Sequence, residues 1–205
     1  FYGKYQVANV EAKTGSLNAH SPGGNTGTSG GWQIVFIYES PALNAKNIAL
    51  FDGYAHVTKD INNFDVLVDG FQTIPSGPVR TKMIIGALEG DRDLSGDQLQ
   101  VKNVAGNFVS ISTPSRPANN FFNSKITQNG SDFVDRNPAS LNTLGFDAGD
   151  FNLDNPNNQV ITNNQTSAIF RMTSNQETYG LYLLGMAVDV FEPSINPLKL
   201  NLNTT

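Results

Sequence analysis

The chain has 205 residues, a formal net charge of −5 and no cysteine, and only 15% of its residues are charged. This length fits one large domain or at most two small ones. The acidic balance argues against nucleic-acid binding, and the lack of cysteine excludes disulfides, thiol catalysis and cysteine-based zinc sites. No apolar run approaches the roughly 20 residues that span a bilayer.

The first half of the chain has the alternating pattern of β-strands. The run GGWQIVFIYES at 30–40 is short, apolar and rich in β-branched and aromatic residues, which predicts a buried sandwich strand. Alternation also predicts a strand at 47–57, with Asp52-Gly53 as a turn or bulge inside it. The same reasoning predicts strands at 63–71, 79–90 and 97–104.

The second half continues this pattern, with strands predicted at 121–127, 167–174 and 179–191. One short helix is expected at 135–146, where Asn137 would cap and Pro138 would take the first helical position. About eight to ten strands joined by Gly, Asn and Pro turns predict an all-β fold, an antiparallel two-sheet β-sandwich of jelly-roll type. We expect one domain at 1–193, followed by a linker or tail at 194–205.

Five segments, taken in order, resemble a module of very large bacterial surface proteins. They are GGWQIVFIYESPALNAKNIALFDGY, GALEGDRDLSGDQL, PANNFFNSKI, LGFDAGDF and YGLYLLGMAVDVFEP. The proteins concerned are multi-domain adhesins of the Bacteroidetes, exported by type IX secretion, and some of them serve gliding motility (the SprB-like group). The resemblance runs from about Tyr5 to Pro193, nearly the whole chain.

This resemblance implies an extracellular, non-enzymatic β-sandwich module on the bacterial cell surface. Its partners would be neighbouring modules of the same longer chain, with surface glycans or polysaccharide as a further class. The resemblance carries over no catalytic residues. Because the sequence starts at Phe1 within folded-looking sequence, we expect a mature or excised segment of something larger.

The stretch EGDRDLSGDQ at 89–98 is the strongest candidate for a metal site. It brings Glu89, Asp91, Asp93 and Asp97 together with two glycines, and Ca²⁺ prefers six to eight oxygen ligands. The spacing is not that of an EF-hand. Two readings stay open: a structural calcium ion, or a turn that is solvated or bridged by Arg92.

A second acidic loop is expected at 146–158, where Asp147, Asp150 and Asp154 accompany several asparagines. Taken alone, this composition suits an ordinary turn as well as a metal loop. If the fold placed the loop beside residues 89–97, repulsion among the carboxylates would demand a counter-ion.

Catalysis is the weaker expectation. A glycosidase needs two carboxyl groups across a cleft, and Glu39 or Glu89 at strand ends would be candidates, although nothing in the sequence pairs them. Neither His20, in a glycine-rich loop, nor His56, expected to face solvent on a strand, belongs to a nucleophilic motif. A Lys–Asn isopeptide bond would use Lys46, Lys82 or Lys125, and the sequence gives no reason to choose one of them.

Aromatic residues carry the last expectations. Trp32, Phe36 and Tyr38 share one parity and are expected in the core, or, if exposed, to stack on sugars. Phe121 and Phe122 are expected on opposite faces, one buried and one partly exposed. We therefore expect a contact or display module of a surface adhesin, with a carbohydrate-binding module as the alternative and a glycoside hydrolase as a more distant one.

Overall fold

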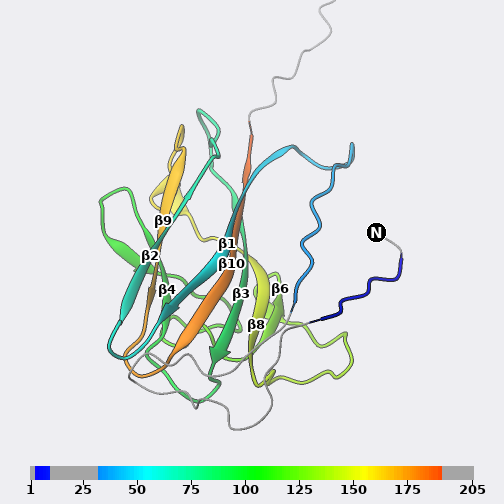
Figure 1. The fold of residues 1–205 in the computed structure, drawn as a ribbon. Helices are drawn as coiled ribbons and strands as arrows, with labels where there is room; N and C mark the ends of the chain where they lie inside the picture. Colours follow the sequence, from blue (N-terminus) through cyan, green and yellow to red (C-terminus); the bar gives the residue numbers. More distant parts are fainter. Residues whose placement is uncertain (1–2, 10–31, 191–205) are drawn as a thin grey trace, which may run out of the picture.

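The computed structural model describes residues 3–9 and 32–190, which fold into two packed β-sheets (Figure 1). The six-stranded sheet has the order β1 (Lys46–Val57), β10 (Tyr179–Asp189), β3 (Thr81–Gly90), β8 (Gly145–Asn152), β6 (Ile126–Gln128) and β7 (Ser131–Asp132). The four-stranded sheet has the order β2 (Asn63–Asp69), β9 (Ser167–Thr173), β4 (Gln98–Lys102) and β5 (Phe108–Ser110). The predicted all-β, two-sheet sandwich is confirmed.

Almost all strand pairs are antiparallel, and only β6 and β8 are recorded as a parallel pair. The one helical element in the described part of the chain is a 3-10 turn, η1 (Pro156–Asn158). Among the same residues, no helix has the length and apolar character needed to cross a bilayer.

The hydrophobic core lies between the two sheets. On β2, β4 and β9 every second residue points inward, so alternation in the sequence becomes burial in the fold. Leu99 and Val101 on β4 and Val66 and Val68 on β2 follow the predicted parity. The six-stranded sheet contributes Met83, Ile85, Ala87, Phe151, Leu181, Leu184, Met186 and Val188.

Most strand predictions are confirmed. Strands occupy most of 47–57, 63–71, 79–90, 97–104, 167–174 and 179–191. The bulge predicted at Asp52-Gly53 is also present, because the pairing of β1 with β10 shifts register between Asp52 and Ala55.

The buried strand predicted at 30–40 is wrong where the structure describes it. Residues 32–40 form no strand, and Trp32, Phe36 and Tyr38 are exposed by 59%, 43% and 59%. Tyr5 packs edge-on against Phe36, with 5.5 Å between the ring centroids. Both parities of this segment are apolar, so a strand here would need cover on two faces, and the sandwich buries neither. The aromatic stripe is therefore not part of the core.

The helix predicted at 135–146 is wrong. The side chain of Arg136 donates from Nη1 to the carbonyl of Pro138 at 2.6 Å and from Nη2 to the carbonyl of Ser140, which are groups that a helix would bond internally. Leu144 and Gly145 then take left-handed backbone, with φ of 55° and 85°. The turn ends there and β8 begins.

The acidic loop predicted at 146–158 is also wrong in its first half, which is strand β8. Gly145–Asn152 pairs along its length with β3, so Asp147 lies opposite Ala87 and Asp150 opposite Ile84. The sequence of this strand does not have a typical strand pattern, because it contains glycine and aspartate, which are poor strand formers. Pairing on both edges of the strand overrides that propensity.

Phe121 and Phe122 are both fully buried, so the expectation that one would be exposed is wrong. The strand predicted at 121–127 is wrong over most of its length, because β6 starts only at Ile126, and the pleat that would separate the two rings is absent. Phe122 stacks on Tyr179, with 4.4 Å between ring centroids, and Phe121 packs edge-on against Phe151. The expected tail at 194–205 and His20 lie outside the described residues.

Candidate functional site

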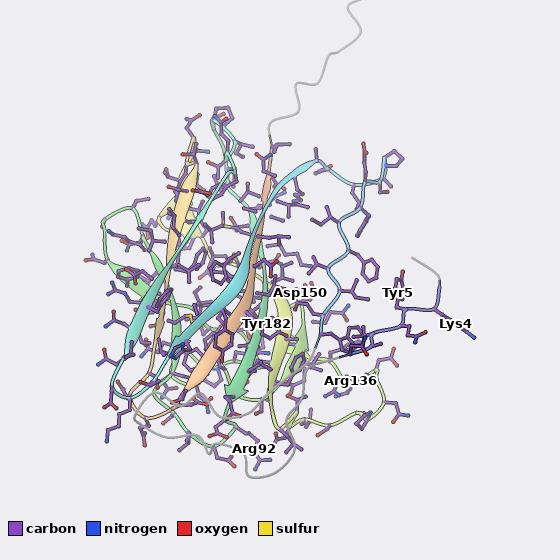
Figure 2. The ribbon with its side chains drawn as sticks, in the orientation of Figure 1. Lys4, Tyr5, Arg92, Arg136, Asp150 and Tyr182 are labelled. Carbon is purple, nitrogen blue, oxygen red and sulfur yellow. The ribbon has the colours of Figure 1, made fainter. Side chains whose placement is uncertain are left out.

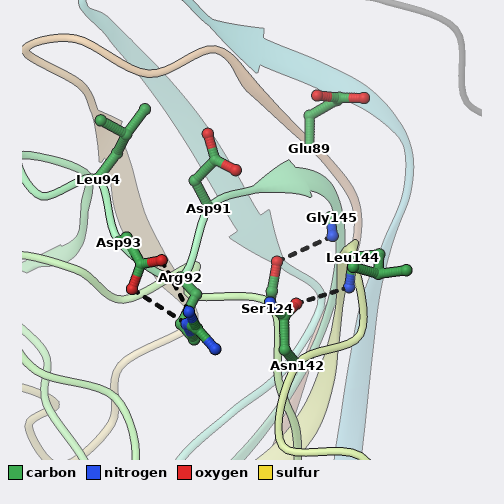
Figure 3. A pocket seen from close by; sticks show the side chains of 9 residues that line it. All are labelled: Glu89, Asp91, Arg92, Asp93, Leu94, Ser124, Asn142, Leu144 and Gly145. Carbon is green, nitrogen blue, oxygen red and sulfur yellow. Dashed lines mark hydrogen bonds and ion pairs between the residues drawn. The ribbon is translucent and has the colours of Figure 1, made fainter.

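The acidic stretch 89–98 forms the connection from β3 to β4 at one end of the sandwich. Glu89 has φ of 70°, and the pairing with β8 shifts register between Leu88 and Gly90. This bulge turns the chain away from the sheet. A cleft of about 300 Å³ opens beside it and is lined by Glu89, Asp91, Arg92, Asp93, Leu94, Ser124, Asn142, Leu144 and Gly145 (Figure 3).

The carboxylates that line this cleft do not converge. Figure 3 shows Glu89, Asp91 and Asp93 apart from one another, with Asp93 joined to Arg92. Arg92 donates from Nε and Nη2 to the two carboxylate oxygens of Asp93, at 3.0 and 2.9 Å. Both side chains are exposed. The arginine bridge left open by the sequence therefore exists, but it joins two neighbouring residues at the surface.

A second arginine, Arg116, forms a buried ion pair at the same end of the molecule. Its Nη1 lies 2.6 Å from Oδ1 of Asp147, and neither side chain is exposed to solvent. Asp147 also accepts hydrogen bonds from the backbone N–H groups of Ser124 and Lys125, at 3.2 and 3.0 Å. Burial raises the pKa of the Asp147 carboxyl, and Arg116 acts in the opposite direction.

All five N–H donors of Arg116 are used. Besides Asp147, the guanidinium donates to Oγ1 of Thr127 and to three backbone carbonyls, at distances between 2.7 and 3.3 Å; these carbonyls belong to Phe121, Lys125 and Ala148. A buried arginine is tolerated when its charge is paired and every donor is satisfied. Arg116 therefore fastens the 116–125 segment to strand β8.

Two further carboxyl groups are buried nearby, on Asp97 and Glu177. Asp97 Oδ2 accepts a hydrogen bond from the N–H of Phe122 at 2.7 Å, and Glu177 Oε1 accepts one from the N–H of Asp91. The other oxygen of each carboxyl, Oδ1 of Asp97 and Oε2 of Glu177, is buried and has no hydrogen-bond partner in the described chain. Such atoms are rare in folded proteins.

The pKa of both carboxyl groups is raised. Burial is the main cause at Asp97, where it brings the pKa to about 6, and Asp147 adds to it. The pKa of Glu177 is raised to about 10, first by burial and then by the negative charges of Asp97, Asp91 and Asp147. The two groups are thus close enough to repel each other when ionised.

Three connections bring these groups together: 89–97, 119–124 and 174–178. Ser124 links two of the elements, because its hydroxyl donates to the carbonyl of Gly90 and accepts from the N–H of Gly145 at 2.8 Å. A Cβ on Gly90 would overlap both Oδ2 of Asp147 and the carbonyl oxygen of Phe122. Gly90 is therefore needed for the close approach of the 89–97 connection to the 119–124 connection and to β8.

The predicted metal residues separate into groups. Asp97 and Asp147 are buried in the interior, and Glu89, Asp91 and Asp93 border the cleft. Asp150 faces away on β8, where Oδ2 forms an ion pair with Lys82 Nζ at 2.7 Å, and Asp154 is exposed. Of the second acidic segment, the fold brings only Asp147 beside the first acidic stretch, and Arg116 is its counter-ion. Within the described ranges, no group of three acidic or histidine side chains is placed to hold a metal.

Sequence reasoning missed Arg116 and Glu177. Arg116 stands in STPSRPANNFF, where its proline and serine neighbours suggest an exposed turn, and Glu177 stands in SNQETYG, another polar turn. The one available signal was adjacency: each lies within a few residues of a predicted strand or aromatic pair. Nothing in the local pattern shows that these turns fold inward.

The other catalytic and covalent candidates lie elsewhere. Glu39 is exposed, and His56 is half-buried beside the ring of Tyr54. Lys46 pairs with Asp189 and Lys125 with Asp132. Lys82 pairs with Asp150 and donates to Oδ1 of Asn129 at 3.1 Å, and its side chain is 48% exposed.

The second surface feature is the outer face of the six-stranded sheet. Tyr182 lies over Gly86 there, with its ring 2.7 Å from the position of a Cβ on that glycine, and Tyr54 lies over Gly180 in the same way. Leu50 and Ile84 cover Gly185. Figure 2 shows Tyr182 over the middle of the sheet, far from Arg92. We call this surface the outer apolar face, and it consists of Ile48, Leu50, Tyr54, Ile84, Leu88, Phe146 and Tyr182.

The chain matches no protein-family model, and no curated protein matches it. The fold and the two surface features described above therefore carry the functional interpretation.

Proposed function

We propose that this chain is a non-enzymatic contact module of a bacterial cell-surface adhesin, displayed outside the cell beside other modules of a longer protein. The observation that supports this function is the outer apolar face. Ile48, Leu50 and Tyr54 are exposed by 43%, 38% and 49%. Apolar side chains gathered on one exposed face mark an interaction site in soluble domains.

The rigidity of this face suits contact. It is built on paired strands, and its side chains lie flat over glycines that leave them room. A preformed surface loses little conformational entropy when a partner docks. The buried acids support the same interpretation, because Asp147 is held by Arg116 and by backbone N–H groups, which stabilise the fold.

The test compares the two sheets. Antibodies against the purified chain should label intact cells of its bacterium, and the purified chain should bind those cells saturably. Leu50→Ser with Tyr54→Ser should weaken this binding about tenfold or more. Leu67→Ser is the matched control, because Leu67 is 57% exposed on β2, in the other sheet. Labelling only after lysis, or equal binding by the double variant, would contradict the proposal.

A carbohydrate-binding module is the second candidate, and the two tyrosines favour it. Flat aromatic rings on an exposed sheet can stack on sugar rings, and Tyr182 also stacks with Phe146, with 6.5 Å between ring centroids. On this candidate, Tyr54→Ala and Tyr182→Ala should abolish binding to purified surface polysaccharide, and Leu50→Ala should leave it within about twofold of wild type. Polysaccharide that neither binds nor competes would eliminate it.

A further inference from the structure

We infer that a single Ca²⁺ ion binds inside the sandwich end between Asp97 and Glu177, using the carboxylate oxygens Oδ1 and Oε2 that lack a hydrogen-bond partner in the described part of the chain. This inference does not rest on the proposed adhesin function. It differs from the calcium site expected from the sequence, since Glu89, Asp93 and Asp150 take no part and Glu177 comes from the β9–β10 connection.

The first argument is the balance of buried charge. The buried charged residues of the described chain are Asp97, Asp147, Glu177 and Arg116. Arg116 neutralises Asp147 at 2.6 Å. Asp97 and Glu177, when both are ionised, therefore leave two negative charges that no cationic side chain of residues 3–9 and 32–190 is recorded to pair, and a divalent cation would supply two positive charges.

The second argument is hydrogen bonding. Asp97 is 0% exposed and Glu177 is 1% exposed, yet one oxygen of each has no hydrogen-bond partner among the residues that the structure describes. The other oxygen of each group is fixed by a backbone N–H, from Phe122 and Asp91 respectively. These hydrogen bonds fix the two carboxyl groups and leave one oxygen of each free to donate an electron pair. A metal ion is an acceptor of such electron pairs.

The third argument concerns the type of metal and its route. The donors are hard oxygens, and the chain has no cysteine, which favours calcium over zinc or copper. Asp91 connects the site to solvent, because its N–H binds Glu177 while the residue itself lines the cleft of about 300 Å³. Since only two carboxylates contribute, water and main-chain oxygens complete the six to eight ligands of Ca²⁺.

The competing explanation is that both carboxyl groups carry a proton and bind nothing. The two explanations separate on Glu177→Gln and Asp97→Asn, which keep the shape and remove the charge. Protonated groups would tolerate the amides with little loss of stability. Calcium ligands would lose the ion, because an amide oxygen contributes no net charge.

The experiment titrates CaCl₂ into the EDTA-treated, dialysed full chain by calorimetry and repeats thermal melting with and without CaCl₂. We expect one Ca²⁺ per chain and a higher melting temperature with calcium for wild type. The matched control is Asp93→Asn, an exposed acid of the same stretch, which should respond like wild type. Glu177→Gln and Asp97→Asn should weaken calcium binding by about tenfold or more.

Several results would overturn the inference. They are a wild type that shows neither binding heat nor a melting shift, a Glu177→Gln variant that responds as fully as wild type, and a larger response to MgCl₂ than to CaCl₂. If a variant fails to fold, the calcium titration of the wild type still tests whether the chain binds Ca²⁺. Luminescence of Tb³⁺ excited through Tyr179 is a second readout, since Tyr179 lies close enough to Asp97 and Glu177 for their charges to raise its pKa.

Discussion

Arg116 and Asp147 form an ion pair from which solvent is excluded on both sides, with 2.6 Å between Nη1 and Oδ1. The pair spans 31 residues of sequence and joins the 116–125 segment to β8. Because the other donors of Arg116 bind Thr127 and three carbonyls, the pair is the centre of a network. Its role is to hold the end of the sandwich where Asp97 and Glu177 are buried.

Removing one partner of this pair should be strongly destabilising. We expect Arg116→Met to lower the free energy of unfolding by about 3–5 kcal/mol, because it leaves Asp147 buried and uncompensated. Urea denaturation followed by circular dichroism measures this. The double variant Arg116→Met/Asp147→Leu should recover part of the loss.

The control for this prediction is Arg92→Met. Arg92 also pairs with an aspartate, Asp93, but both side chains are exposed, and exposed pairs contribute little to stability. Its urea midpoint should match wild type within error. An equal effect of Arg92→Met and Arg116→Met would show that burial does not decide the contribution.

Gly90 gives a second prediction, based on space. Gly90→Ala should lower the free energy of unfolding by about 2 kcal/mol or more, because its Cβ would overlap main-chain oxygen of Phe122, which cannot swing away. Gly106→Ala is the matched control: Gly106 has φ of 85° and no neighbour within 4 Å of a Cβ, so only backbone strain of about 1 kcal/mol applies. Similar losses in the two variants would contradict the steric explanation.

The sandwich itself was predictable, for a physical reason. Val66, Val68, Leu99 and Val101 alternate with polar residues because one side of each strand meets the core. The strand predictions are wrong where the pattern of apolar residues does not correspond to the pattern of burial. Residues 32–40 are apolar on both parities and are not buried, whereas β8 contains Asp147 and Asp150 and is a paired strand.

The site was only half predictable. Asp97 and Asp147 were selected because acids cluster near them in the sequence, and both are buried at the same end of the fold. Arg116 and Glu177 were not, because their partners are 31 and 86 residues away. The pairing of strands that are distant in the sequence brings Arg116 and Glu177 to this site, and no local sequence pattern indicates that pairing. The conspicuous acids Glu89 and Asp93 remain at the surface of the cleft.

The last prediction is a pH dependence of stability in EDTA. The pKa of Asp97 is raised to about 6 and that of Glu177 to about 10 in the folded chain, whereas both would ionise near pH 4 when unfolded. At a pH between the unfolded and the folded pKa of each group, the folded chain binds more protons than the unfolded chain, so the free energy of unfolding falls as pH rises. The stabilisation is complete below about pH 4, declines as pH passes 6, and continues to decline toward 10.

The charged and titratable groups around this pair act in known directions. Asp91 and Asp147 raise the pKa of Glu177. Two carboxyl groups outside this cluster have lowered pKa values: Arg171 lowers that of Asp65, and Lys125 lowers that of Asp132 against the opposing effect of burial. Their contribution to stability is lost only in acid, as pH falls below about 4. The free energy of unfolding from urea denaturation at pH 5, 6.5, 8 and 9 in EDTA should therefore fall steadily, by a few kcal/mol in all. Glu177→Gln should make the free energy of unfolding nearly independent of pH above pH 6.5, since it removes the group that titrates there.

Saturating CaCl₂ should have the same effect on wild type, because a bound ion stabilises both carboxylates in their ionised form. A wild-type stability in EDTA that rises between pH 5 and 9 would show that the two buried carboxyl groups are not protonated in the folded chain.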